Sequence, residues 1–144
     1  MKGLHPLYLP YYHALCDMLS DSWQPISGLR TFDEQAKLYA QGRTEPGLMV
    51  TRARPGMSFH NYGLATDWDF FEGSKYSPLG YEDERWDEYE NACEKVGLVT
   101  LSWERPHNQL TVKYPIRDIL AAYNRGGMVA VNVLLGDDNG NFVA

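Results

Sequence analysis

Residues 58–67, SFHNYGLATD, constrain the fold of this chain more than any other segment. His60 stands just before a predicted strand, and Asp67 lies inside that strand seven residues later. The two side chains converge on one point if the intervening turn folds back, and Gly63 permits the backbone angles that such a turn requires. The segment therefore predicts a polar site where a turn enters a strand.

A second polar segment lies at residues 103–109, WERPHNQ. Two imidazoles, those of His60 and His107, together with the Asp67 carboxylate form a known ligand set for catalytic zinc, which keeps a fourth position for water. We expect a tight turn over residues 104–108, from which Glu104 points its carboxylate at that water. On spacing alone, capping or solvent-exposed roles for these residues stay open.

Periodicity and end signals predict a small set of helices and strands around these segments. The expected helices cover residues 10–19, 31–42, 83–96 and 115–123, and the expected strands cover residues 26–30, 64–71, 98–103 and 109–113. In the second helix, Thr31 and Glu34 complete a capping box. Residues 42–57, rich in Gly, Pro and Arg, are expected to form a long loop of the kind that is often functional.

The chain length predicts one domain, since 144 residues suffice for a single core. We assign residues 1–127 to this domain and residues 128–144 to a C-terminal tail of unknown role. The tail is expected to form a hairpin around Asp138, Asn139 and Gly140.

The charge balance argues against two classes of partner. A net charge of −6 and the absence of any Lys/Arg-rich run lack the electrostatic footprint that duplex nucleic acid or an anionic bilayer requires. The longest apolar stretches, such as residues 128–135, are too short to span a membrane. The first residues, MKGLHPLYLPYYHALCDML, lack the uninterrupted apolar core of a signal peptide, so we expect synthesis in the cytoplasm.

The two polar segments resemble the zinc D-Ala-D-Ala carboxypeptidases and L-alanyl-D-glutamate endopeptidases that cut bacterial cell-wall stem peptides. The family pattern, S-x-H-x-x-G-x-A-x-D followed later by E/D-x-x-H, is matched at seven positions: Ser58, His60, Gly63, Ala65, Asp67, Glu104 and His107. Residues 27–44, SGLRTFDEQAKLYAQGRT, also resemble the family's strand, arginine and helix. The resemblance covers residues 4–123, and the most similar versions are phage or prophage endolysins.

The resemblance implies a fold and a set of roles. The fold is α+β, with helices packed on a small antiparallel sheet that carries the zinc, as in the hedgehog and D-Ala-D-Ala peptidase folds. The implied zinc ligands are His60, Asp67 and His107. Glu104 is then the catalytic carboxylate, Arg30 faces the scissile carbonyl, and Ser58 contacts the substrate near the metal.

Two of these roles have plain structural alternatives. Arg30 is also placed to pair with Asp33 or Glu34 in the next helical turn. The Ser58 hydroxyl alone can tie down the turn before His60.

Four further residues are weaker candidates. Asp69 shares a strand face with Asp67 and either orients a ligand histidine or makes a structural hydrogen bond. Arg43, Arg52 and Arg54 either attract the carboxylates of a stem peptide or form a solvated loop face.

We therefore expect a monomeric zinc peptidase that hydrolyses an amide bond in peptidoglycan stem peptides at the bacterial cell wall. L-Alanyl-D-glutamate endopeptidase activity, as a phage or prophage endolysin, is the leading interpretation. D-Ala-D-Ala carboxypeptidase activity and a non-catalytic zinc-fold binding module are the alternatives. A purely structural zinc site ranks last because it requires four protein ligands, and the sequence supplies three.

Overall fold

The computed structural model of the protein describes residues 1–137, 139–140 and 142. Its elements are α1 (Leu9–Met18), β1 (Trp23–Ser27), α2 (Phe32–Ala40), the 3-10 helix η1 (Phe59–Tyr62), β2 (Ala65–Glu72), β3 (Lys75–Tyr76), α3 (Trp86–Val96), β4 (Leu98–Leu101), β5 (Glu104–Leu110) and α4 (Ile116–Leu134). The predicted α+β class is confirmed. None of the helices in the described ranges is long and apolar enough to cross a membrane.

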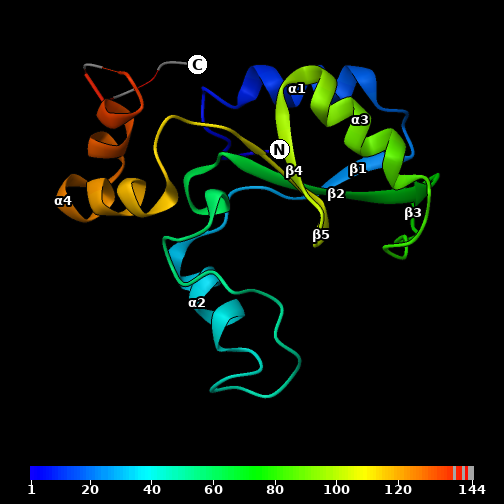
Figure 1. The fold of residues 1–144 in the computed structure, drawn as a ribbon, viewed down its shortest axis with the longest axis horizontal. Coiled ribbons are helices and arrows are strands. Elements are labelled where there is room, and N and C mark those ends of the chain that lie inside the picture. Colours follow the sequence, from blue (N-terminus) through cyan, green and yellow to red (C-terminus); the bar gives the residue numbers. More distant parts are fainter. Residues whose placement is uncertain (138, 141, 143–144) are drawn as a thin grey trace.

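The sheet is built around β2. Its strands follow the order β1-β2-β5-β4, with β3 paired to β2 off this path, and each of these pairs is antiparallel. Helices α1 and α3 cover one face, while α2 projects on the opposite side (Figure 1). The first five residues of β2 are buried on both faces of the strand. This central strand is therefore the most shielded place in the sheet for a polar site.

Aromatic side chains fill the layer between the sheet and its covering helices. The Trp23 ring stacks on Tyr89 with a centroid distance of 5.3 Å and packs against Trp86 at 5.2 Å. Trp68 projects from β2 into the same buried cluster. Such large rings remove much apolar surface from water, so this layer contributes to the hydrophobic stabilisation that holds α1 and α3 to the sheet.

A buried polar network crosses this apolar layer and joins β2 to β5. Thr66 and Asn108 face each other in register, and the Asn108 side-chain amide donates to Thr66 Oγ1 at 3.0 Å. The Tyr8 hydroxyl contacts both residues, and the Tyr89 hydroxyl donates to the Pro106 carbonyl at 2.6 Å. The network fixes the two strands relative to each other immediately beside Asp67 and His107.

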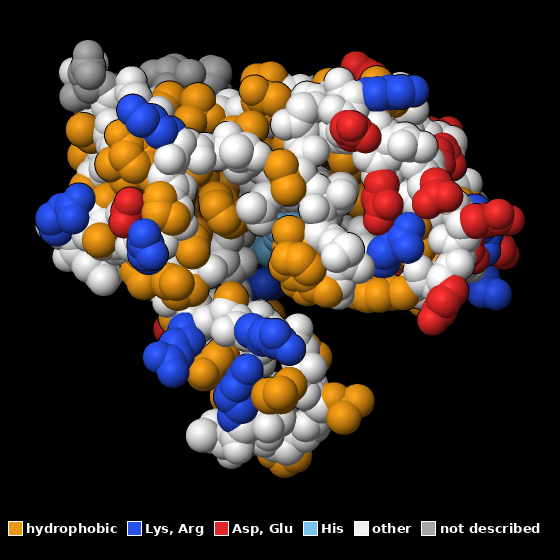
Figure 2. All heavy atoms as spheres, viewed as in Figure 1, with side chains coloured by type: hydrophobic (Ala, Val, Ile, Leu, Met, Phe, Trp, Pro, Cys, Tyr) orange, Lys and Arg blue, Asp and Glu red, His pale blue; other side chains and the backbone are white. Residues whose placement is uncertain are grey.

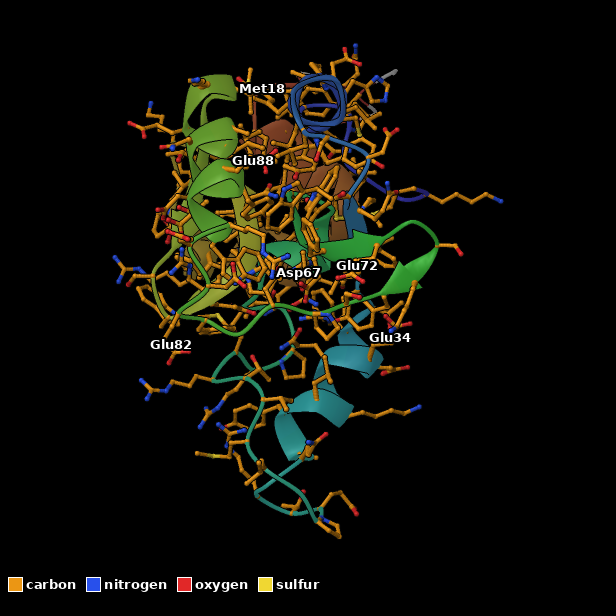
Figure 3. The ribbon with its side chains drawn as sticks, turned by 90° about the vertical axis from the view of Figure 1, so that its right-hand side faces the viewer. Met18, Glu34, Asp67, Glu72, Glu82 and Glu88 are labelled. Atoms are coloured by element: carbon orange, nitrogen blue, oxygen red, sulfur yellow. The ribbon has the colours of Figure 1, made fainter. Side chains whose placement is uncertain are left out.

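Helix α2 and the loop after it form a lobe, residues 31–57, below the sheet (Figure 1). Its start is as predicted: Thr31 Oγ1 accepts from the Glu34 amide, and the Glu34 carboxylate accepts from the Thr31 amide. Figure 3, in which Asp67 and Glu34 are labelled, shows Asp67 at the boundary between the sheet and this lobe.

Two predicted boundaries were wrong. The strand expected over residues 26–30 is Trp23–Ser27, so Pro25 lies inside an edge strand, where its missing N–H is tolerated. The turn expected over residues 104–108 is instead part of β5, and residues 102–103 make the turn. Between Thr100 and Leu101 the pairing in β5 jumps from Asn108 to Glu104, which leaves residues 105–107 bulged.

The hairpin expected in residues 128–144 is also wrong where the structure describes it. Residues 128–134 continue α4 beyond a kink at Gly126 and Gly127, whose backbone angles are not helical. Val131 is fully buried, with Met128 and Leu134 packed on the same core at helical spacing, and this burial favours helix over strand. Asp138, at the expected hairpin tip, lies outside the described residues.

Gly63 closes the turn that leads from η1 into β2. Its φ angle is +70°, and a Cβ there would lie 2.6 Å from the Gly3 carbonyl oxygen and 2.7 Å from the His5 nitrogen. The His5 amide also donates to the Gly63 carbonyl at 2.9 Å. The N-terminal segment therefore packs directly on the backbone beside His60.

Replacing Gly63 by Ala tests this close approach. Gly73 is the matched control, because its φ angle is +62° and a Cβ at this position would meet no heavy atom within 4 Å. We expect Gly73→Ala to lower the free energy of unfolding by about 1 kcal/mol, the cost of the left-handed conformation. Gly63→Ala should lower it by about 2–4 kcal/mol, because overpacking is added to that cost. Urea denaturation of both variants measures the difference, and equal losses would contradict the close contact.

Candidate metal centre

Three side-chain atoms from distant parts of the chain meet at one point. His60 Nε2 lies 3.2 Å from Asp67 Oδ1 and 3.2 Å from His107 Nδ1, and the last two atoms are 3.3 Å apart. All three residues are buried. The convergence predicted for His60 and Asp67 is confirmed, and His107 completes the triangle.

The size of this triangle fits a tetrahedral metal ion. Ligand atoms at about 2.0–2.1 Å from a tetrahedral ion lie about 3.3–3.4 Å from one another. Two imidazole nitrogens and one carboxylate oxygen at 3.2–3.3 Å therefore need almost no movement to share an ion. A fourth position is left for water or substrate, since the cluster in the described residues contains these three groups alone.

The sheet register positions two of the three ligands. Asp67 in β2 and His107 in β5 are directly opposite cross-strand neighbours, so their side chains leave the sheet on the same face. His60 reaches the same point from η1, where the Ser58 hydroxyl accepts from the His60 amide and caps the 3-10 turn.

Hydrogen bonds set which nitrogen of each imidazole faces the cluster. His60 Nδ1 lies 2.8 Å from the Gly28 carbonyl, which only accepts, so Nδ1 carries the proton and Nε2 presents its lone pair. His107 Nε2 lies 2.9 Å from Gln109 Oε1, which leaves His107 Nδ1 free for an ion. Such outer contacts hold a metal-binding histidine in the required tautomer.

The electrostatics of the cluster favour positive charge. Burial acts to raise the pKa of the Asp67 carboxyl, but hydrogen bonds and charge from His107 and His60 hold it well below its usual range. Burial acts to lower the pKa of His107, and the neighbouring Asp67 outweighs this and raises it. Asp67 is therefore an anion that demands a proton or a metal cation beside it.

Arg30, which precedes the N-cap of α2, points toward the cluster rather than toward the first turn of that helix. Its Nη2 lies 3.6 Å from Asp67 Oδ2, and its Nη1 donates to Gln35 Oε1 at 3.1 Å. Ser27 Oγ lies 3.5 Å from Nη2. The alternative pairing with Asp33 or Glu34 does not occur in the described residues. The guanidinium is therefore fixed beside the metal position, with donors available to a bound oxygen.

Glu104 begins β5 and is half-buried. It belongs to a strand and not to the expected turn, and the bulge of residues 105–107 follows it. The negative charge of Glu104 makes a small contribution to the raised pKa of His107. Burial raises the pKa of the Tyr81 hydroxyl, and the charges of Glu104 and Asp67 add to that shift. Glu104 is therefore close enough to the cluster to influence it.

The weaker candidates separate into distinct structural roles. Asp69 accepts from the Leu79 amide and the Tyr76 hydroxyl, so it holds residues 70–79 and contacts no histidine. Arg43 donates to the carbonyls of Tyr39 and Thr51, which makes it a brace within the lobe. Asp69 thus makes the structural hydrogen bonds of its second interpretation, whereas the hydrogen bonds of Arg43 to the backbone match neither alternative given for it.

Sequence reasoning missed three contributors. Gln109 carries a detectable signal, because a side chain two positions after His107 on a strand shares its face. Gln35 is fully buried in α2, and only the packing of the loop over it explains a buried amide there. Gly28 acts through its carbonyl, which every residue possesses, so no sequence signal exists for it.

The fold and the His-Asp-His cluster define the class: an α+β protein with a three-ligand metal-type site on an antiparallel sheet. The sequence profile of the VanY family, described as D-alanyl-D-alanine carboxypeptidase, matches residues 14–114. This match covers more than half of the chain, and the protein belongs to this family.

The chain is similar to one curated protein in sequence and to two solved structures in fold. It is 61% identical over 70 residues to the peptidoglycan L-alanyl-D-glutamate endopeptidase CwlK of Bacillus subtilis (strain 168), and this match covers 46% of the chain and 42% of CwlK. The L-Ala D-Glu endopeptidase ChiX of Serratia marcescens has a similar fold, with a TM-score of 0.50, 20% identity and coverage of 81% and 84%. The L,D-carboxypeptidase DacB of Streptococcus pneumonia gives a TM-score of 0.53 at 22% identity, with coverage of 84% and 73%.

Paired carboxylate variants test which acid holds the ion. We expect the wild-type protein to bind one equivalent of added Zn2+ and Asp67→Asn to lose it, because the anionic ligand is removed. Asp69→Asn keeps the shape of its side chain and lies two residues away, and it should retain the metal. Metal content after gel filtration, measured by plasma mass spectrometry, decides the matter. Loss of zinc from Asp69→Asn alone would contradict the assignment.

Gln109→Leu tests the outer contact of His107. Without the amide oxygen, His107 Nε2–H loses its acceptor, and metal affinity should fall about 10–100-fold. Gln109→Glu supplies a stronger acceptor at the same place and should bind at least as tightly as wild type. Competition titration with a chromophoric chelator measures both affinities. Unchanged affinity in Gln109→Leu would show that the tautomer is fixed by other means.

Proposed function

We propose that this protein is a zinc-dependent peptidase that hydrolyses an amide bond in peptidoglycan stem peptides, with His60, Asp67 and His107 as zinc ligands. The observation that carries the proposal is the 3.2–3.3 Å triangle of these ligand atoms with the Arg30 guanidinium fixed beside it. Membership of the VanY family and the 61% identical segment of CwlK support the same substrate class.

The chemistry needs a nucleophile and a proton carrier. Zinc bound at three protein ligands supplies a Lewis acid that can bring the pKa of a water molecule to about 7. Glu104 then acts as the general base that takes the water proton and as the general acid that gives it to the departing amine. Its position at the start of β5, half-buried and near His107, suits a carboxylate that must exchange protons with substrate.

Arg30 is assigned to the developing negative charge on the carbonyl oxygen. Its guanidinium is held by Gln35 and lies 3.6 Å from Asp67, so its donors need little reorganisation when charge appears. Loss of such a donor costs about 2.7–4 kcal/mol of transition-state stabilisation, which is about a hundred- to a thousandfold in rate. Ser58 is assigned to substrate contact as well as to its observed cap on η1.

The bond that we assign is the L-alanyl-D-glutamate bond, and we propose that the protein acts as a bacteriolytic endolysin. This preference rests on the identity to CwlK, whose name states that specificity. D-Ala-D-Ala carboxypeptidase activity is the second candidate, because the family description names it.

Glu104→Gln provides the test of mechanism. Purified sacculi should release peptides with wild-type enzyme, and the variant should lose at least about a hundredfold in rate because general acid–base transfer is removed. The variant should still bind zinc. Glu94→Gln, an exposed change on α3, is the matched control and should digest at the wild-type rate. Full activity of Glu104→Gln, or of wild type after exhaustive chelation, would overturn the mechanism.

Mass spectrometry of the released muropeptides identifies the bond. An endopeptidase leaves L-alanine as a new carboxyl terminus and D-glutamate as a new amino terminus. A carboxypeptidase releases free D-alanine and leaves the rest of the stem attached. Release of D-alanine alone would replace the endopeptidase assignment by the second candidate.

A further inference from the structure

The loop of the lobe carries a charge opposite to that of the whole chain. Residues 43–54 contain three arginines and one glutamate, in a protein whose net charge is −6. Figure 2 shows Lys and Arg side chains gathered on the lobe, while Asp and Glu side chains gather on the side of the molecule that α3 occupies in Figure 1. The lobe therefore presents a locally positive surface next to the metal centre.

Gln35 determines which side chains of this loop face outward. Its side-chain amide, fully buried, donates to the Ala53 carbonyl at 2.8 Å and lies 3.4 Å from Thr51 Oγ1. The Ala53 amide also donates to Thr51 Oγ1 at 3.0 Å. Thr51 and Ala53 are thus held toward α2, and the alternate residues, Arg52 and Arg54, are exposed.

The same glutamine joins this loop to the metal centre. Gln35 Oε1 accepts from Arg30 Nη1 at 3.1 Å, and Arg30 in turn lies 3.6 Å from Asp67. A single buried side chain therefore separates the Ala53 backbone from the guanidinium beside the metal position. Arg52 and Arg54 flank Ala53 in the chain, so the loop segment that carries them is joined to the metal centre through Gln35 and Arg30.

The three arginines of the loop differ in the hydrogen-bond partners of their guanidinium groups. Arg43 gives two hydrogen bonds to backbone carbonyls and stacks over Tyr39, with 3.9 Å from its Cζ to the ring centroid. Arg54 donates through Nε to the Tyr39 hydroxyl at 3.2 Å, which fixes the side chain and leaves its two terminal nitrogens without a hydrogen-bond partner in the described part of the chain. Arg52 makes no hydrogen bond or ion pair with any described residue.

We propose that Arg52 and Arg54 form a carboxylate-binding subsite, and that it takes the free carboxylate of the stem-peptide D-glutamate. The proposal rests on the proposed function and names the part of the substrate that the lobe recognises. D-Glutamate in a stem peptide keeps one carboxylate free, because the other is used in the chain. A guanidinium offers a planar pair of donors that matches a carboxylate, and its charge attracts the acid before contact.

Binding without turnover tests the subsite. The probes are the tripeptide L-Ala-D-Glu-L-Lys, in which the γ-carboxyl of glutamate forms the bond to lysine, and its D-isoglutamine counterpart. In the counterpart an amide replaces the α-carboxylate of glutamate, and both peptides keep the carboxylate of lysine. Each is titrated calorimetrically into zinc-loaded Glu104→Gln, which keeps the site but removes the proton carrier. We expect the acid to bind about tenfold or more tightly than the amide, since a hydrogen bond from a guanidinium to a charged carboxylate is stronger than one to a neutral amide oxygen.

Arginine variants in the same background locate the effect. Combined Arg52→Gln and Arg54→Gln should weaken binding of the acid about tenfold or more and leave the amide within about twofold. Lys37→Gln, an exposed change on α2 that removes one positive charge from the same lobe, is the matched control and should leave both affinities unchanged. Equal zinc content and thermal midpoints show that each variant is folded.

Two results overturn the subsite while the proposed function stands. The first is equal affinity of zinc-loaded Glu104→Gln for the acid and the amide peptide. The second is an unchanged affinity for the acid peptide when Arg52→Gln and Arg54→Gln are added to that variant. In both cases the wild-type enzyme still digests sacculi. If zinc-loaded Glu104→Gln binds neither peptide and the wild-type enzyme digests no sacculi, both the subsite and the proposed function fail.

Discussion

The rest of this structure depends on the close approach of two imidazole nitrogens and one carboxylate oxygen. His60 Nε2, His107 Nδ1 and Asp67 Oδ1 lie 3.2–3.3 Å apart in a buried place, with the other imidazole nitrogens committed to Gly28 and Gln109. Lone pairs brought this close repel unless a proton or a metal cation lies among them. The strand register, the cap on η1 and the polar network behind the sheet all serve to hold these atoms together against that repulsion.

The site and the fold differ in how far the sequence reveals them. His60, Asp67 and Gly63 lie within ten residues, so local turn chemistry predicts their arrangement. The sequence predicts Glu104 on a turn, whereas the structure has it on a strand. The bulge at residues 105–107 lies beside α3, whose Tyr89 hydroxyl donates to the Pro106 carbonyl, and such a contact between distant segments leaves no local sequence signal. The helical conformation of residues 128–134 was not predicted for a similar reason. Burial of Val131 against the core favours the helix, and this burial depends on tertiary packing that the local sequence does not show.

The metal centre draws its support from two parts of the molecule, the sheet and the lobe. The sheet sets Asp67 and His107 through direct cross-strand pairing. The lobe sets Arg30 through Gln35, and Gln35 is held by the loop at Ala53. Rearrangement of the loop would therefore reach Arg30 without disturbing the strand-borne ligands. Such a division lets one part of the molecule fix an ion while another adapts to what approaches it.

The contact between the N-terminal segment and Gly63 has a practical consequence for handling this protein. The His5 amide bonds to the Gly63 carbonyl, and Gly3 lies against the same glycine, so the first residues buttress the turn that carries His60. An affinity tag fused directly ahead of Met1, without a spacer, would strain the contacts between these first residues and Gly63. A flexible spacer at this end protects the histidine's setting during purification and immobilisation.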